Sequence, residues 1–398
     1  MTEAFITERR EAMRFVLAPD SYKGTMSAVR VCEVMSRAIL AELPGAQIDR
    51  VPMADGGEGT VEAIVAATNG RVVELEATGP LGIPVAARFG VIEREDGPCA
   101  VLEAASLFGL PMVGEADRNP LNATSRGLGD AIRAALDLGL RSFVVGLGGS
   151  ATNDGGIGML AALGVRFYNA GGKELPGFGR DLPELDRIDW TCLDERIGAC
   201  SFLIASDVDN PLLGQRGATR VFGPQKGAGE DVVERLEAAM SAYAEKMKAL
   251  SGSDLGDEPG AGAAGGIGFA LLHLGGKIVQ GARVVGEASG LQARIAGADW
   301  VVTGEGSSDG QTLSGKAPFY VARLAEAAGK PALLVSGSLG EGWERLLPHY
   351  AGCFSTVTRP VGLDEALRRA EANLHAAVRN AVKLIVRAGR TNFSDTNP

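Results

Sequence analysis

The chain has 398 residues, of which 45% are hydrophobic, so it is long enough for two cores of ordinary domain size. Its formal net charge of −10 argues against nucleic-acid and anionic-membrane partners, because both require a basic face. No apolar run reaches the roughly 20 residues of a membrane span, and the charged N-terminus lacks the apolar segment of a secretory signal. The five cysteines are scattered and have no CxxC spacing, which predicts reduced thiols in a cytoplasmic protein.

The N-terminal part of the chain alternates between strand, polar loop and helix. We predict strands at 15–18 and 48–53, with a helix starting near Ser27 between them. The loop after the second strand carries Asp55 and Glu58 among three glycines. This composition favours a loop that presents a carboxylate to a ligand or to Mg²⁺, although a capped turn is the alternative.

The pattern changes after residue 79. Segments 85–92 and 99–103 alternate as an antiparallel hairpin does, and the strand–helix rhythm returns near residue 293. We therefore predict a two-domain α/β protein: a Rossmann- or flavodoxin-like parallel-sheet domain built from both chain ends, and an inserted mixed α/β domain. Ligands are expected at strand carboxyl ends and in the cleft between the domains.

The predicted boundaries are 14–78 and 293–388 for the first domain, 79–292 for the inserted domain, and 1–13 and 389–398 for disordered tails. The other predicted strands are 142–145, 165–168, 202–205, 300–303, 332–336 and 353–356, and the other predicted helices are 124–138, 230–249, 287–295, 318–328 and 364–387.

The segment 142–160, SFVVGLGGSATNDGGIGML, has the pattern of strand, loop and helix. The helix is expected to open near Asp154, and the glycines before it would leave backbone amides uncovered at a helix N-terminus. Such amides favour a phosphate or a carboxylate. The candidate anion-binding residues are Gly148, Gly149, Ser150, Asn153 and Asp154.

Two common phosphate loops fit this segment poorly. A P-loop ends in Gly-Lys-Ser/Thr, which is missing here. Gly146, Gly148 and Ala151 nearly match the dinucleotide fingerprint, but that motif also needs an acidic residue after the next strand, and the strand at 165–168 is followed by Asn169 and glycines. An NAD-linked oxidoreductase is therefore an alternative with little support.

Eight motifs spread over residues 15–387 together resemble the glycerate kinase family of the bacterial glycerate and glucarate catabolic type. The motifs are APDSYKGTMSA, PMADGGEGTVEA, TGPLGIPV, GLGGSATNDGGIGML, SDVDNPLLG, VFGPQKGA, PGAGAAGGIG, and TGEG with DGQTLSGKAP. The resemblance implies phosphorylation of D-glycerate by ATP and Mg²⁺, with 2-phosphoglycerate favoured over 3-phosphoglycerate, in a monomer or homodimer. A kinase of a related small hydroxy acid and a catalytically silent sensor of acidic metabolites are the alternatives. One departure is Ser307, where the family usually has arginine.

The residue chemistry also suits a small-molecule kinase. Phosphoryl transfer needs amides around the phosphates, one or two carboxylates for Mg²⁺, a cation for the developing charge and an acceptor for the hydroxyl proton. We expect Asp207 to be the base, with Asp209 and Asp309 as rivals, because it follows the strand at 202–205. The metal candidates are Asp309, Glu305, Asp55 and Glu58. The cationic candidates are Lys23, Lys226 and Lys316, and the further phosphate or substrate contacts are Asn210, Gln311 and Thr312.

Overall fold

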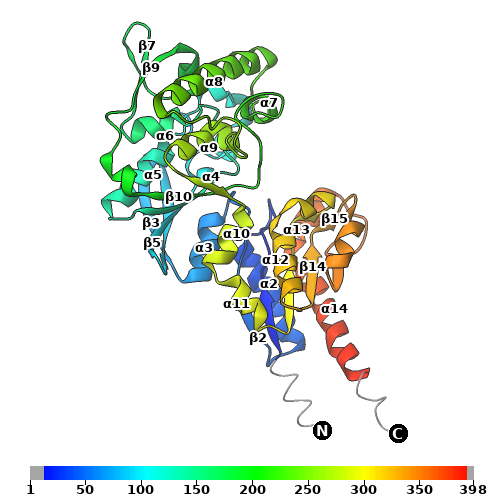
Figure 1. Cartoon of the computed structure of the whole chain (residues 1–398). Coiled ribbons are helices and arrows are strands. Elements are labelled where there is room, and N and C mark those ends of the chain that lie inside the picture. Colours follow the sequence, from blue (N-terminus) through cyan, green and yellow to red (C-terminus); the bar gives the residue numbers. More distant parts are fainter. Residues whose placement is uncertain (1–12, 392–398) are drawn as a thin grey trace. The chain divides into compact units, whose positions relative to one another are not determined.

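The computed structural model describes residues 13–391, which divide into two compact units (Figure 1). The first unit holds residues 13–54, 62–67 and 285–391, and the second holds 55–61 and 68–284. Each unit has its own sheet and its own hydrophobic core. Within the described range, no helix is both long and apolar enough to cross a membrane.

The first unit is built on a five-stranded sheet in the order β16-β14-β12-β1-β2, and every neighbouring pair is parallel. The strands come from both ends of the chain, as predicted, and the blue and orange ribbons of Figure 1 lie together in this unit. Its strands are β1 (Arg14–Leu17), β2 (Gln47–Arg50), β12 (Trp300–Thr303), β14 (Ala332–Ser336) and β16 (Gly352–Ser355), with a short pair β13 (Ser307–Ser308) and β15 (Ser338–Leu339). Its helices are α2 (Ala28–Glu42), α11 (Leu291–Ala296), α12 (Ala317–Ala327), α13 (Leu363–Arg368) and α14 (Ala370–Thr391), while α3 (Thr60–Thr68) and α10 (Gly281–Ala288) include residues of both units.

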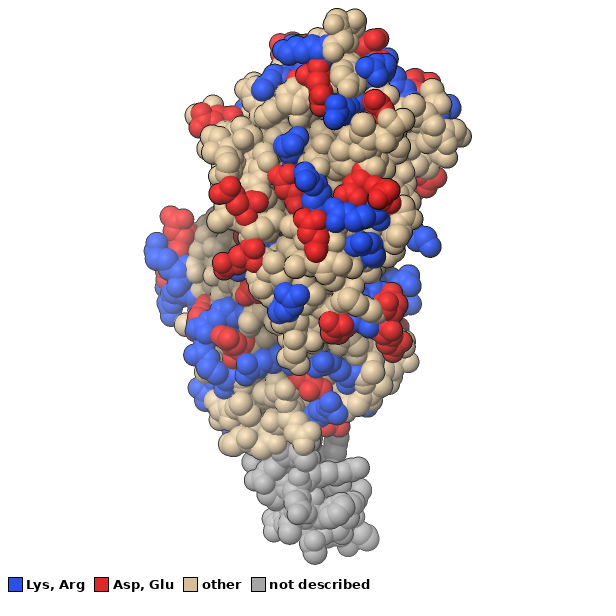
Figure 2. Space-filling view, turned by 90° about the vertical axis from the view of Figure 1, so that its left-hand side faces the viewer, with Lys and Arg blue, Asp and Glu red and all other residues tan. Residues whose placement is uncertain are grey.

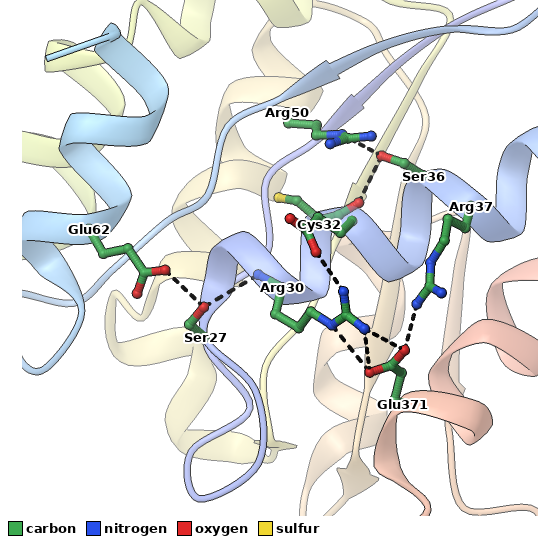
Figure 3. Close-up of polar contacts among 9 residues, drawn as sticks. Ser27, Arg30, Cys32, Ser36, Arg37, Arg50, Glu62 and Glu371 are labelled. Carbon is green, nitrogen blue, oxygen red and sulfur yellow. Dashed lines mark hydrogen bonds and ion pairs between the residues drawn. The ribbon is translucent and has the colours of Figure 1, made fainter.

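Helices α2 and α14 pack against each other in the core of the first unit. Ser27 caps α2, because its Oγ accepts the Arg30 amide, as the expected start of this helix requires. Figure 3 shows Glu371 of α14 between Arg30 and Arg37 of α2. All three side chains are over 40% exposed, so these ion pairs contribute little to stability. The apolar contacts beneath them hold the two helices together.

Leu374 on α14 is the clearest test of that packing. Its side chain is fully buried in the core of the first unit, whereas Leu384 on the same helix is 65% exposed. Replacing Leu374 by Ala should lower the free energy of unfolding by about 2–5 kcal/mol, since it leaves a cavity. Leu384→Ala should change it by less than about 0.5 kcal/mol. Urea denaturation of the two variants compares them, and equal effects would contradict this assignment of the buried face.

Two predicted helices are each divided in the structure. The segment predicted at 364–387 forms α13 and α14 with a break at Arg369, and Gly290, with φ of +63°, separates α10 from α11 near the helix predicted at 287–295. The predicted tails also differ. Met13 packs against the core and α14 runs to Thr391, so residue 13 and residues 389–391 are not tails, while 1–12 and 392–398 lie outside the described residues.

The second unit contains a six-stranded mixed sheet in the order β11-β10-β6-β5-β4-β3. The pairs among β5, β6, β10 and β11 are parallel, and β3-β4 and β4-β5 are antiparallel, so the predicted hairpin is present. Its strands are β3 (Arg71–Thr78), β4 (Pro84–Arg94), β5 (Gly97–Glu103), β6 (Ser142–Gly146), β10 (Ser201–Ala205) and β11 (Lys277–Val279). Its helices are α4 (Ala104–Phe108), α5 (Arg126–Asp137), α6 (Ile157–Ala162), α7 (Ala218–Phe222), α8 (Glu230–Ser251) and α9 (Ala263–His273).

The boundaries between the units differ from the predicted ones. The sequence suggested a change at 79, but β3 pairs with β4 along its whole length and so brings residues 68–78 into the second unit. Residues 55–61 also belong to the second unit, and its C-terminal limit is 284 instead of 292. A strand was not predicted at 71–78, although residues there alternate in exposure as an edge strand does.

A smaller three-stranded sheet lies apart from the main one in the second unit. It has the order β8-β7-β9, with β7 (Arg166–Asn169), β8 (Glu174–Leu175) and β9 (Leu185–Asp189) all antiparallel. The strand predicted at 165–168 therefore exists as β7, but it does not continue the parallel sheet. This arrangement removes the strand that a dinucleotide-binding unit would need after its glycine loop.

Candidate functional site

Loops gather at the carboxyl edge of the parallel strands in the second unit. The loop 147–156 follows β6, residues 206–210 follow β10, and Glu103 ends β5. The carboxyl ends of neighbouring parallel strands meet at one edge of a sheet, which is where α/β proteins bind ligands. This edge therefore brings together most of the residues that the sequence singled out in the inserted segment.

Gly146 at the end of β6 and Gly148 in the loop allow another loop to pack closely against them. The Gly148 amide donates to the Gly56 carbonyl oxygen at 3.0 Å, and a Cβ on Gly148 would lie 2.6 Å from the Gly57 Cα. A Cβ on Gly146 would lie 2.6 Å from the Gly56 oxygen. Only glycine allows the segment 55–57 to cross the loop this closely.

The next part of the loop leaves amides unused. Gly149 is exposed and has φ of +73°. In the described part of the chain, no hydrogen bond has the amide of Gly149 or Ser150 as its donor, while the Gly149 oxygen accepts from Leu110 and the Ala151 amide donates to Phe108. These flanking bonds hold the loop, so its free amides have a defined place.

Asp154 supports the loop from inside the protein. The helix expected to open at this residue begins at Ile157 as α6, and Asp154 is fully buried before it. Its carboxylate accepts the Ser125 amide and hydroxyl, each at 2.7 Å, and the amides of Gly156 and Gly158. Burial raises the pKa of Asp154, and these donors oppose the shift. Both of its oxygens are engaged in joining the loop to the start of α5 and α6.

Asp154→Ala should therefore destabilise the protein. Removing the carboxylate leaves several buried donors without a partner, and each such group costs about 1–3 kcal/mol. Asp209→Ala is the matched control, because Asp209 forms an exposed ion pair with Arg216 worth about 0–1 kcal/mol. Urea denaturation should show a loss of at least about 2 kcal/mol for the first variant only. Similar stability of both variants would mean that Asp154 does not organise the loop.

Lys226 places a buried amine beside the loop. It ends the short helix η6 (Pro224–Lys226), is 3% exposed, and donates from Nζ to the Thr152 oxygen at 2.6 Å and the Ser150 Oγ at 3.3 Å. Burial lowers the pKa of Lys226 to about 8, against the opposing effect of Asp154. The amine can thus be positive near neutral pH in a place where it has little solvent.

Asn153 follows Thr152, whose backbone oxygen accepts from this amine, and it is fully buried. Its Nδ2 donates to the Thr219 Oγ1 at 2.9 Å, and its Oδ1 is buried with no hydrogen-bond partner among the described residues. A buried amide oxygen without a donor costs stability, so it indicates a group kept for a ligand. Thr219 and Lys226 both come from the segment after 217, which holds the two polar groups in place.

Asp207 stands at the carboxyl end of β10, as predicted. Its side chain is exposed, and its Oδ1 accepts the Gly281 amide at 2.9 Å. A Cβ on Gly281 would lie 2.2 Å from the Asp55 carbonyl, so Asp55 and Asp207 are both next to this glycine. Two carboxylate residues from distant parts of the sequence are thereby close together.

Asp209, the rival candidate for the base, and Asn210, the expected neighbour of Asp207, have other partners. Asp209 pairs with Arg216 at 2.9 Å, and both side chains are more than two-thirds exposed. The Asn210 Nδ2 donates to the Arg216 backbone oxygen at 2.7 Å. Asn210 and Asp209 thus stabilise the conformation of this loop. Asp207 is then the acidic residue of the loop that lies at the carboxyl edge of the sheet.

The first unit has a separate polar cluster at the carboxyl edge of its own sheet. Glu305 is 8% exposed, and its Oε1 accepts hydroxyl hydrogen bonds from Ser308 and Thr312. The Lys316 Nζ lies 3.6 Å from Glu305 and 3.9 Å from Asp309. Burial raises the pKa of Glu305, and Lys316 opposes the shift. The cluster is an ammonium held between two carboxylates.

The other candidates of the first unit are more exposed. Lys23 is exposed on the loop after β1, and Gln311 is exposed in the short helix η7 (Gly310–Ser314) after β13. Asp309 caps that helix by accepting the Gln311 amide at 2.8 Å. Ser307 is exposed and its Oγ accepts the Ser338 hydroxyl at 2.9 Å. At the position where the family usually has arginine, this chain therefore has a small hydroxyl group that is hydrogen-bonded to a second serine.

The carboxylates fit Mg²⁺ in the way that kinases use it. No group of three or more His, Cys, Asp or Glu side chains suited to a metal occurs among residues 13–391. Mg²⁺ at a nucleotide site usually takes only one or two carboxylates, because phosphate oxygens and water complete its shell. Asp55 offers such an oxygen close to Gly57, Glu58 is exposed on the same turn, and Glu305 and Asp309 offer theirs beside Lys316.

Three polar residues of these networks were missed in the sequence. Ser125 and Thr219 hold the loop 150–154 through Asp154 and Asn153, and the Glu103 Oε2 accepts the Val61 amide at 2.9 Å. Glu103 could have been found, since it ends a strand predicted at 99–103. The other two had no signal, because their partners lie 29 and 66 residues away.

Comparison with known proteins agrees with this geometry. The sequence profile of the glycerate kinase family matches residues 15–386. The chain belongs to the glycerate kinase family. It is 42% identical to the glycerate kinase of Bacillus subtilis, over 96% of this chain and 100% of that protein. It is 43% identical to the glycerate 2-kinase of Escherichia coli K12, over 92% and 97% of the two chains.

A solved structure agrees as well. The crystal structure of a Salmonella typhimurium LT2 protein assigned as glycerate kinase 2 superposes with a TM-score of 0.83 at 42% identity, covering 95% of this chain and 99% of that one. These findings confirm the resemblance read from the eight motifs. The relatives are named as kinases, so this chain is a member of a family of phosphotransferases.

Proposed function

We propose that this protein transfers the γ-phosphoryl group of ATP to D-glycerate and forms 2-phosphoglycerate. The observation that carries the proposal is the buried Lys226 amine beside the unused amides of Gly149 and Ser150. Positive charge and preorganised donors are what phosphoryl transfer requires, since the protein mainly positions the reactants and stabilises charge. The name of the Escherichia coli relative supports C2 as the phosphorylated position.

In this proposal the amides of Gly149 and Ser150 and the Lys226 amine bind phosphate oxygens. Asn153 adds its side-chain Oδ1, which has no partner among the described residues and would accept a hydrogen bond from a ligand hydroxyl. Asp207 accepts the proton of the attacking hydroxyl and mainly orients it, because the transition state is loose. Asp154 supports these groups from within the protein and takes no direct part in binding.

Mg²⁺ would be held by Asp55 and Glu58 in preference to Glu305 and Asp309. Lys316 already lies within 4 Å of the second pair, and Mg²⁺ there would have to compete with an ammonium. When bound, Mg²⁺ would neutralise charge on the phosphate oxygens. Lys23, Gln311, Thr312 and Lys316 remain candidate contacts for glycerate or phosphate. We also propose that the two units are the two expected domains and that the enzyme works in the cytoplasm.

A coupled assay of ADP formation with a panel of small hydroxy acids tests the activity. We expect turnover with D-glycerate well above that with L-glycerate, lactate or glycolate. NMR of the product should show phosphorus coupled to the proton on C2. Absence of ADP formation with D-glycerate would refute the proposal, and coupling to the C3 protons would correct its position.

A further inference from the structure

A hollow of about 510 Å³ lies on the second unit beside the candidate site. It is lined by Glu74, Leu75, Ala86, Ala87, Arg88 and Ser106. Three of these residues are apolar, and the two charged ones have opposite signs. On the face drawn in Figure 2, by comparison, Lys and Arg side chains intermingle with Asp and Glu side chains.

The strand register explains why this hollow exists. In β4 and β5 the last pair towards the carboxyl end of β5 is Gly90 with Val101, so the ribbon of β3 and β4 extends beyond β5. Ala87 faces the core, while Ala86 and Arg88 are exposed and alternate to the opposite face. The extended ribbon thus forms a wall along the carboxyl edge of the sheet.

Helix α4 separates the hollow from the phosphate-binding loop. Ser106 lines the hollow, and its neighbour Ala105 has its Cβ 3.6 Å from where a Cβ on Gly149 would lie. At the end of α4, the Phe108 oxygen accepts the Ala151 amide at 2.9 Å. The hollow and the free amides of the loop are therefore one short helix apart.

We propose that this hollow binds the nucleoside of ATP, an inference that rests on the proposed kinase function. The volume lies in the range of roughly 300–1,000 Å³ that suits a drug-sized ligand, and a three-carbon acid would fill little of it. Glu74, Ala86 and Arg88 share the exposed face of the β3–β4 ribbon, and the small Ala86 side chain leaves room there for a purine ring. The Glu74 carboxylate can accept ribose hydroxyls, as acidic residues do in dinucleotide sites, and the Arg88 guanidinium can stack on the base or pair with a phosphate.

Ala86→Trp tests this inference, because the indole would fill the hollow from an exposed position outside the core. Isothermal titration calorimetry of the full chain with ADP should give a Kd at least tenfold higher than that of the wild type. Val72→Trp is the control. Val72 is exposed on the same face of β3 as Glu74 but does not line the hollow, so the affinity for ADP should stay unchanged in this variant. The KM for D-glycerate should also stay unchanged in both variants.

Glu74→Gln gives a second, gentler test that does not depend on the fold tolerating Trp. We expect it to reduce the preference for ADP over 2′-deoxy-ADP at least threefold, since the ribose would lose a charged acceptor. Wild-type ADP affinity in Ala86→Trp, or an unchanged preference in Glu74→Gln, would overturn the nucleoside site and leave the kinase proposal standing. Failure of the wild-type chain to bind ADP would overturn both.

Discussion

Replacing Asp207 by Asn is expected to lower kcat for the phosphorylation of D-glycerate by ATP by about 10²- to 10⁴-fold, which is the usual effect of losing a general base. The amide keeps the size of the side chain, and its oxygen can still accept the Gly281 amide that orients Asp207. The variant should therefore fold normally and bind both substrates. Steady-state kinetics at saturating ATP, D-glycerate and Mg²⁺ measure the change.

Asp209→Asn is the matched control on the same loop. Asp209 forms an exposed ion pair with Arg216, so we expect less than about a threefold change in kcat. A fall of less than tenfold in Asp207→Asn, together with loss of turnover in Asp309→Asn, would show that the base lies in the cluster of the first unit instead. Equal losses in both variants of the 206–210 loop would point to loop disruption.

Lys226→Met is expected to lower kcat/KM for ATP by about 10²- to 10³-fold, as removal of one preorganised donor to a developing charge does in other enzymes. Methionine has a similar length and no charge, so it fills the same space between Ser150 and Thr152. Lys246→Met is the control. Lys246 is half-buried on α8 and donates to the Asp186 backbone oxygen, so its loss should leave the kinetics unchanged.

The pKa of Lys226 also predicts two pH dependences of opposite direction. In the free enzyme, kcat/KM should fall as the pH rises through about 8, because the amine loses its proton. The folded chain binds fewer protons than the unfolded chain between pH 8 and 10.5, so the free energy of unfolding should rise with pH across this window. Below pH 8 the burial of the charged amine lowers the free energy of unfolding by its full amount, roughly 3 kcal/mol.

The free energy of unfolding of the Lys226→Met variant therefore shows whether Lys226 has a functional or a structural role. Since Lys226→Met removes a buried charge, its free energy of unfolding at pH 7 should equal or exceed that of the wild type. Denaturation at pH 7 and pH 10 measures this, and the gap between variant and wild type should narrow at the higher pH. A variant that is destabilised at pH 7 as well as inactive would contradict the proposed role.

Local patterns determined much of the fold from the sequence alone. Short β-branched runs such as 142–145 and 300–303 are strands because parallel strands buried on both faces need apolar residues throughout. Ser27 begins a helix because its hydroxyl satisfies an amide at the helix start. These signals act over a few residues, so the parallel sheet built from both chain ends and the hairpin at 84–103 could be predicted.

The site was predicted as a set of loops, and only the tertiary structure shows what the residues within them contact. Gly148 is needed for contact with Gly57, and Asp154 is needed to hold Ser125, although both had been expected to face an anion. The burial that shifts the pKa of Lys226 depends on a loop more than 70 residues away. Packing and burial between such distant segments are properties of the folded chain, which local periodicity and spacing do not encode.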